Sequence, residues 1–290
     1  MDPRELLSKI TALPLITGNL ADDLLSGNFP SVFKGQGIEA DEVRHYEWGD
    51  EIRSIDWNVS ARFGTPYVKI YREERDLTVF LVLDTSASMK NPAATLTPYD
   101  QGVLAAALIA FSAEQAGQRV GAAFFDREIT RVFPPRKGRA QVMTILTGAL
   151  RGGTGGRGSA LGAALQGAGR LLKRRSLVAV VSDFLALDWG EELGALCRKH
   201  DVIALRMGSP RDKEIPNLGL ITLEDPETGL VLHGATGFAS FRSAWAEWHR
   251  ERAHFWRTVC RRSGAAFLDL SAADDVPLAL IRFFGGRRRR

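Results

Sequence analysis

The chain has 290 residues, enough for one large α/β domain with an addition or for two domains. Hydrophobic residues make up 45% and charged residues 25%, an ordinary globular composition that excludes a disordered or fibrous chain. The formal net charge of +4 is matched by the four arginines at 287–290. The rest of the chain is therefore neutral and lacks the basic excess of a nucleic-acid-binding domain.

No segment of the sequence predicts export or a membrane span. Its start, Met1–Glu5, is charged, and its most apolar stretch, 102–113, is shorter than the ~20 residues that cross a bilayer. Cys197 and Cys260 lack the spacing of a zinc site and do not make a disulfide framework. We therefore expect a cytoplasmic protein, with 287–290 as a solvated arginine tail.

Two segments precede the main part of the chain. Residues 1–26 carry leucines and an isoleucine at helical spacing and are expected to form a helical segment. In residues 27–76, glycines separate short segments rich in charges and aromatics, and 65–71 has the pattern of a strand. We interpret 27–76 as a small β-rich module that is too poor in aliphatic residues to fold alone. We expect it to share an interface with the domain that follows.

From Leu77 onwards strands and helices alternate, which predicts an α/β domain over 77–286 with a doubly wound, mostly parallel sheet. Thr97, Pro98 and Asp100 form the start signal of its first helix. The predicted strands are 78–83, 120–125, 129–133, 177–181, 202–207 and 266–270, with a hairpin of 220–223 and 230–233. The predicted helices are 97–115, 139–150, 159–172, 189–200, 238–263 and 275–284.

Three sequence patterns resemble ligand-binding motifs but are better explained as structural features. The glycine-rich loop 153–158 lacks the lysine of a phosphate-binding loop and follows a helix instead of a strand. His249 and His254 are one residue too far apart for the zinc-protease motif. A stripe at helical spacing along 238–263 is expected to face the core; it comprises Phe241, Trp245, Trp248, Phe255 and Val259.

Two of the apolar strands are followed directly by aspartates. The strand 78–83 leads into Asp84-Thr85-Ser86-Ala87-Ser88, and the strand 177–181 leads into Ser182-Asp183. Ligands of such sheets bind at the carboxyl ends of the strands. In a tight loop, side chains at i, i+2 and i+4 can converge, which here joins one carboxylate and two hydroxyls. These oxygen donors suit Mg²⁺, with Mn²⁺ or Ca²⁺ as alternatives.

Asp126, after the strand 120–125, is interpreted as a turn residue.

The pattern at 84–88 resembles the metal-ion-dependent adhesion site (MIDAS) of von Willebrand factor A domains. This resemblance implies a hydroxyl ligand from a second loop and an aspartate from a third, and Asp183 matches the third-loop position. For the second loop, Ser159 at the start of a helix is favoured, and Thr154 in the glycine-rich loop is the alternative. The predicted metal ligands are Asp84, Ser86, Ser88, Ser159 and Asp183.

The module at 27–76 carries a second resemblance. Its pattern is similar to the signature of the domain of unknown function 58 family, and consists of Val43-Arg44-His45-Tyr46, Gly49-Asp50, Arg53, Ile55-Asp56-Trp57, Ala61-Arg62 and Glu73-Glu74-Arg75-Asp76. The resemblance implies a von Willebrand factor A-like domain after the module. It also implies a MoxR-type AAA+ ATPase as partner, because family members are typically encoded beside such ATPases.

Charges of alternating sign run through this signature, at Arg44, Asp50, Arg53, Asp56 and Arg62. We expect an ion-pair network that fixes the module in place. A docking face for a partner is the alternative interpretation.

These observations lead to two hypotheses of function. The favoured one is a non-enzymatic, metal-dependent protein–protein interaction module, in which an Asp or Glu of a partner completes the coordination of the ion. The resemblance to the domain of unknown function 58 family implies that the protein acts together with a MoxR-type ATPase in the assembly or maturation of other proteins. The alternative is a metal-assisted phosphoesterase that uses the same aspartates, but such sites gather more carboxylates and need a nucleophile or general base.

Overall fold

The computed structural model describes residues 38–73, 77–91, 96–152, 158–210, 214–271 and 273–287. All of the expected helical segment 1–26, the first part of the module at 27–37 and the tail residues 288–290 lie outside the described residues. The chain divides into two compact units, one within Pro30–Asp76 and the other with Leu77–Arg290 as its main part. The two are described separately below.

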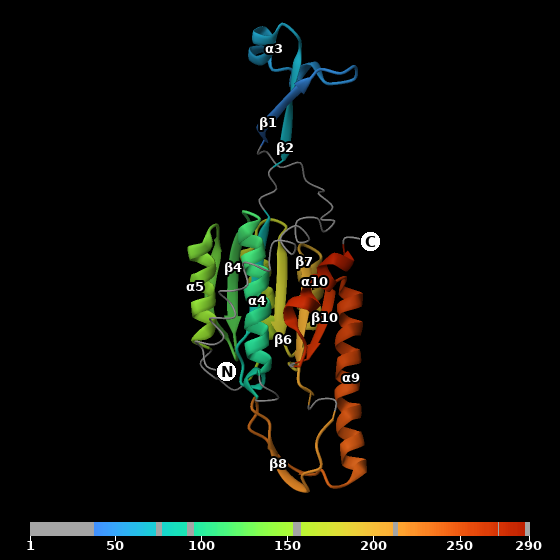
Figure 1. The fold of residues 1–290 in the computed structure, drawn as a ribbon. Helices are drawn as coiled ribbons and strands as arrows, with labels where there is room; N and C mark the ends of the chain where they lie inside the picture. Colours follow the sequence, from blue (N-terminus) through green and yellow to red (C-terminus); the bar gives the residue numbers. More distant parts are fainter. Residues whose placement is uncertain are drawn as a thin grey trace. The chain divides into compact units, whose positions relative to one another are not determined.

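The larger unit is built on a six-stranded sheet (Figure 1). Its spatial order is β10-β7-β6-β3-β4-β5, and every neighbouring pair is parallel except β4 with β5, which is antiparallel. This confirms the predicted α/β fold with a mostly parallel sheet. The strands are β3 (Thr78–Asp84), β4 (Arg119–Phe125), β5 (Ile129–Arg136), β6 (Leu177–Ser182), β7 (Asp201–Gly208) and β10 (Ala266–Ser271).

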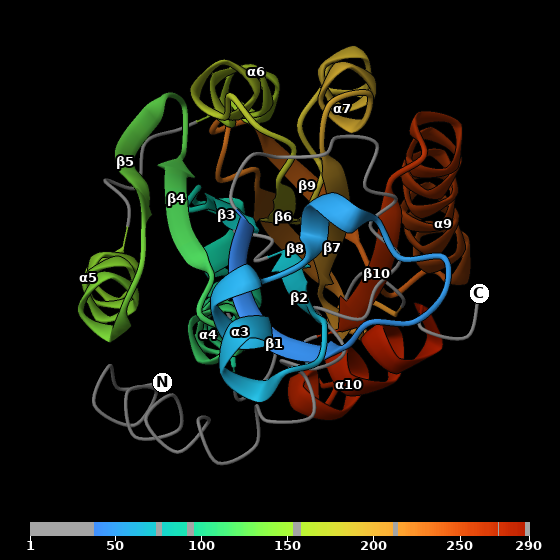
Figure 2. The same cartoon turned by 90° about the horizontal axis from the view of Figure 1, so that it is seen from above.

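Helices cover both faces of this sheet, so each face has its own apolar core (Figure 2). One face is covered by α4 (Pro98–Gln115), α5 (Arg139–Leu150) and α10 (Val276–Arg287). The other is covered by α6 (Leu161–Leu171), α7 (Gly190–Cys197) and α9 (Ala239–Ser263). The central strands β3 and β6 lie between two cores, which explains why their sequences are continuous apolar runs.

Helix α4 crosses the middle of the sheet at close range. A Cβ atom at Gly102 would lie 2.9 Å from Cγ1 of Val181 in β6, so this approach requires glycine. The helix begins as predicted: Thr97 accepts from the Asp100 amide, and the Asp100 carboxylate accepts in return from the Thr97 amide. The helix therefore fixes the positions of the strand ends beneath it.

The expected core face of α9 is wrong for two of its residues. The side chains of Trp248 and Phe255 are 47% and 62% exposed. The buried positions are His249, Ala253, Trp256 and Cys260, offset from the predicted stripe by about one residue around the helix. Trp248 belongs to the first half of α9, which extends beyond the sheet (Figure 1).

That first half of α9 supports the hairpin of β8 (Leu220–Glu224) and β9 (Val231–Ala235). The Phe241 ring packs so closely on Gly234 that a Cβ there would lie 2.9 Å from Cζ. Nη1 of Arg242 donates to the carbonyls of Thr236 and Gly237 at the base of the hairpin. The hairpin is thus held at its base by α9.

The smaller unit pairs β1 (Ile38–His45) with β2 (Tyr67–Glu73) in antiparallel fashion and places α3 (Trp57–Phe63) between them in sequence. A short 3₁₀ turn, η2 (Ile52–Ser54), precedes α3. The sequence did not predict α3. Asp56 begins it by accepting from the amides of Asn58 and Val59, and Gly64 ends it with a φ of 71°.

The ion pair of Arg44 with Asp50, expected as part of the network, is present in this unit. A guanidinium nitrogen of Arg44 lies 2.7 Å from Oδ1 of Asp50, and this hydrogen bond lowers the pKa of Asp50. Between positions 43 and 68, Val68 is the one buried side chain. The described part of the module therefore contributes very little apolar core.

We predict that residues 1–76 expressed alone show no cooperative unfolding, because so few side chains are buried to offset the conformational entropy of ordering the chain. Differential scanning calorimetry and circular dichroism melts of the fragment check this. A sharp, independent transition of the fragment would contradict it and favour the docking-face interpretation of its charges.

Candidate metal centre

The loop after β3 is held in a fixed shape by the neighbouring strand β4. The amide and the hydroxyl of Thr85 both donate to the Phe125 carbonyl, at 2.7 and 2.9 Å. Asp84, Thr85 and Ser86 are completely buried. The chain then enters a 3₁₀ turn, η3 (Ser88–Lys90). The Thr85 side chain is thus hydrogen-bonded to β4. The side chains of Asp84, Ser86 and Ser88 remain as possible ligands of a metal site.

These three side chains lie together, as their spacing predicts. Oδ1 of Asp84 accepts from the Ser86 amide at 2.9 Å, and the hydroxyls of Ser86 and Ser88 are 3.1 Å apart. Oδ2 of Asp84 accepts from the Ser182 hydroxyl at 2.6 Å. The last contact joins the end of β3 to the end of β6.

Asp183 comes to the same place from the end of β6. Its carboxylate accepts from the Leu185 amide at 3.0 Å and from the Ser88 hydroxyl. The next residue, Phe184, has a φ of 55°, which is uncommon for a side chain of this size, and its amide donates to the Ser182 hydroxyl. The structure therefore brings together Asp84, Ser86, Ser88 and Asp183 from two loops that are distant in sequence.

Burial raises the pKa of both aspartates. For Asp84 the burial and the nearby charge of Asp183 outweigh the hydrogen bonds from Ser182 and Ser86, and its pKa rises to about 7. For Asp183 the burial outweighs the hydrogen bonds from Ser88 and Leu185, and the charge of Glu227 adds to the rise in pKa. Two buried carboxylates at close range are unfavourable when both are ionised, and a cation relieves the repulsion.

The second-loop candidate, Ser159, precedes α6. The Ala160 amide donates to the carbonyl of Asp126 at 2.6 Å, which ties this loop to the end of β4. The Ser159 hydroxyl is buried and has no hydrogen-bond partner among the described residues. A buried hydroxyl without a hydrogen-bond partner is what a metal ligand would look like before the metal binds. Thr154, the alternative, lies outside the described residues.

Sequence reasoning missed two residues of this site. Ser182 was seen only as the neighbour of Asp183, although its hydroxyl joins the two strand ends. Glu227, at the tip of the β8–β9 hairpin, accepts from the Ser88 amide at 3.0 Å. It lies 139 positions from Ser88, and nothing in the local sequence signals the contact.

The donor set fits Mg²⁺. Two carboxylates and three hydroxyls are hard oxygen donors of the kind this ion prefers, and two negative charges match its charge. Among the described residues, no group of three or more His, Cys, Asp or Glu side chains is placed to hold a metal. A site of the predicted kind would therefore depend on its hydroxyls.

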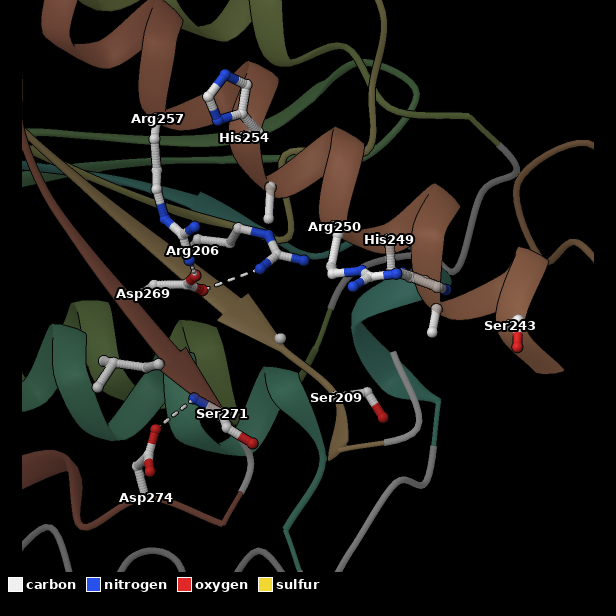
Figure 3. Close-up of a pocket in the computed structure, with 14 residues that line it drawn as sticks. Arg206, Ser209, Ser243, His249, Arg250, His254, Arg257, Asp269, Ser271 and Asp274 are labelled. Carbon is white, nitrogen blue, oxygen red and sulfur yellow. Dashed lines mark hydrogen bonds and ion pairs between the residues drawn. The ribbon is translucent and has the colours of Figure 1, made fainter. Parts of the chain in front are cut away.

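A different cavity, of about 860 Å³, lies between α9 and the ends of β7 and β10 (Figure 3). Arg206 and Arg257 both point at Asp269, with nitrogen–oxygen distances of 2.9 and 2.7 Å. The side chain of Arg206 is only 9% exposed. Asp274 accepts from the Ser271 amide at 2.7 Å. These charges are held by one another, and we interpret the cluster as structural.

The large unit has the α/β fold with a mostly parallel sheet that the resemblance to von Willebrand factor A domains implied. Its fold is similar to that of an aerotolerance-related membrane protein from Bacteroides fragilis, with a TM-score of 0.51 and 15% identity over 74% of this chain and 100% of that one. It is also similar to the SpRpn10 VWA domain, with a TM-score of 0.35 and 9% identity over 71% of this chain and 94% of that one.

The chain belongs to the family described as "Protein of unknown function DUF58", whose profile matches residues 42–254. The uncharacterized proteins Mb1516 of Mycobacterium bovis and Rv1480 of Mycobacterium tuberculosis are each 33% identical to it over 296 aligned residues. Those alignments cover 100% of this chain and 92% of each relative. In the part of the chain that the structure describes, no helix is long and apolar enough to cross a membrane.

We predict that Asp269→Ala lowers the free energy of unfolding by about 2–3 kcal/mol, because it leaves the buried Arg206 without this carboxylate. Chemical denaturation measures the change. The matched control is Glu247→Ala, which removes an exposed ion pair with Arg250 and should cost under about 0.5 kcal/mol. Equal effects of the two variants would show that the Asp269 cluster is not structural.

Proposed function

We propose that this protein is a metal-dependent protein-interaction module. In this proposal Asp84, Ser86, Ser88, Ser159 and Asp183 hold Mg²⁺ at the carboxyl ends of the central strands. The observation that carries the proposal is the pair of neighbouring aspartates, the buried Asp84 and the partly buried Asp183, whose hydroxyl neighbours complete an oxygen-rich cluster.

The charge balance favours an acidic side chain as the external ligand. Two carboxylates and three neutral hydroxyls cancel the charge of the ion, so the five ligands themselves leave no surplus negative charge to repel another carboxylate. Five protein ligands also leave one position of an octahedral ion open. An Asp or Glu presented by a partner protein would fill it.

The partner that we propose is a MoxR-type AAA+ ATPase, with a shared role in the assembly or maturation of other proteins, in the cytoplasm. Support for this step comes from the family resemblance alone. Size-exclusion chromatography of the chain with a MoxR-type ATPase from the same organism, in Mg²⁺ and in EDTA, tests it. Co-elution in Mg²⁺ that is lost in EDTA is the expected result, and separate elution in both would contradict the partnership.

We predict that Mg²⁺ raises the melting temperature of the wild-type protein and has no such effect on Asp84→Ala. An ion that binds only the folded state stabilises it by mass action, and Asp84 provides its central carboxylate. Thermal melts with Mg²⁺, Mn²⁺, Ca²⁺ or EDTA measure the effect and rank the three ions. If the ions raised the melting temperature of Asp84→Ala as much as that of the wild type, the proposed metal site would be refuted.

The second-loop ligand can be assigned by a pair of variants. We predict that Ser159→Ala weakens metal affinity, because it deletes the buried hydroxyl that has no protein partner, whereas Thr154→Ala leaves the affinity nearly unchanged. Isothermal titration with Mn²⁺ compares the two. The reverse ranking would assign the position to Thr154 and leave the rest of the site intact.

A further inference from the structure

The tip of the β8–β9 hairpin is built to hold one side chain in a fixed place. Oδ1 of Asp225 accepts from the Glu227 amide at 2.9 Å, and Oδ2 accepts from the Thr228 hydroxyl at 2.6 Å. The Asp225 carbonyl accepts from the amide of Gly229, whose φ of 72° suits glycine. With its base held by α9, the hairpin presents Glu227 from a constrained turn.

Glu227 points at the candidate metal centre. Its Oε1 accepts from the Ser88 amide, inside the loop that carries three of the proposed ligands. Its charge is close enough to raise the pKa of Asp183. Its second oxygen, Oε2, is buried and has no hydrogen-bond partner among the described residues.

A third carboxylate beside Asp84 and Asp183 is unfavourable when all three are ionised, and a cation relieves the repulsion. Among the described residues, Asp84, Asp183 and Glu227 do not form a three-carboxylate metal cluster. Glu227 therefore stands at the approach to the site, with one oxygen anchored on Ser88 and the other uncommitted. Glu227 thus presents the same carboxylate group that the site would accept from an acidic side chain of a partner.

We propose that Glu227 is an internal ligand, whose uncommitted oxygen turns to the ion when the ion binds and takes the coordination position that a partner's carboxylate would take. This inference rests on the proposed function. It means that the β8–β9 hairpin must move, or exchange its carboxylate, before an acidic partner binds. The site is then selective for partners that also displace the hairpin.

The simpler alternative is that Glu227 only accepts from the Ser88 amide. Glu227→Gln separates the two roles, because the amide oxygen of glutamine still accepts that hydrogen bond but carries no charge and is a weaker metal ligand. Glu227→Asp is a second variant, which keeps the charge and shortens the reach by one methylene. Glu224→Gln, on the same hairpin, is the matched control for the loss of one negative charge.

The test measures water on Mn²⁺ bound to the full-length protein. Electron paramagnetic resonance counts the bound ion, and water-proton relaxation reports the water molecules that the bound ion holds. We expect Glu227→Gln and Glu227→Asp to gain one coordinated water per bound Mn²⁺, and Glu224→Gln to match the wild type. Acetate should remove that water in the Glu227 variants at lower concentration than it perturbs the wild type.

The outcomes separate this inference from the proposal on which it rests. If Mn²⁺ binding requires Asp84 but the Glu227 variants and the wild type hold the same amount of water, the internal ligand is refuted and the metal site stands. If Mn²⁺ does not bind, or binds equally well to Asp84→Ala, both proposals fail. Melting curves without metal confirm that each variant is folded.

Discussion

The contact on which the site depends is the one between the ends of β3 and β6, where the buried Asp84 and the partly buried Asp183 lie close together. The parallel register pairs Leu83 with Val181, so Asp84 meets Ser182, and Asp183 follows just beyond the sheet. A slip of one residue would turn these side chains to the opposite face. Two apolar cores, one on each face of the sheet, hold that register. The packing of the domain thus maintains a pair of carboxylates that would repel each other in isolation.

Much of the larger unit could be predicted, because its central strands are buried on both faces and appear in the sequence as apolar runs. The start of α4 was also predictable, since Thr97 and Asp100 form a local capping box. Helix α3 was missed because its seven residues have no apolar stripe, and its signals are only the cap at Asp56 and the glycine at its end. The face of α9 was wrong at Trp248 and Phe255 because periodicity shows that a helix has an apolar side but not which of its apolar residues the sheet covers.

In the candidate site, too, local sequence signals could be predicted and tertiary contacts could not. Asp84, Ser86, Ser88 and Asp183 were predictable, because a strand end followed by short-range spacing is local information, and parallel strands bring such ends together. The contact of Glu227 with Ser88 was not predictable, because it depends on how α9 holds the base of a hairpin and how far the tip reaches. Residues that a tertiary arrangement brings to a site leave no pattern in the sequence around them.

The two charged clusters of the larger unit differ in a way that indicates where a ligand belongs. Around Asp269, two guanidinium groups bind both oxygens of one carboxylate, so the charges satisfy one another within the protein. Around Asp84 the acidic groups accept hydrogen bonds from hydroxyls and backbone amides, and the pKa values of both aspartates are raised although the charge of Arg206 acts to lower that of Asp183. Neutral donors orient a carboxylate but do not cancel its charge. The proposed cation would do both, and it would also offset the repulsion between Glu227 and the two aspartates.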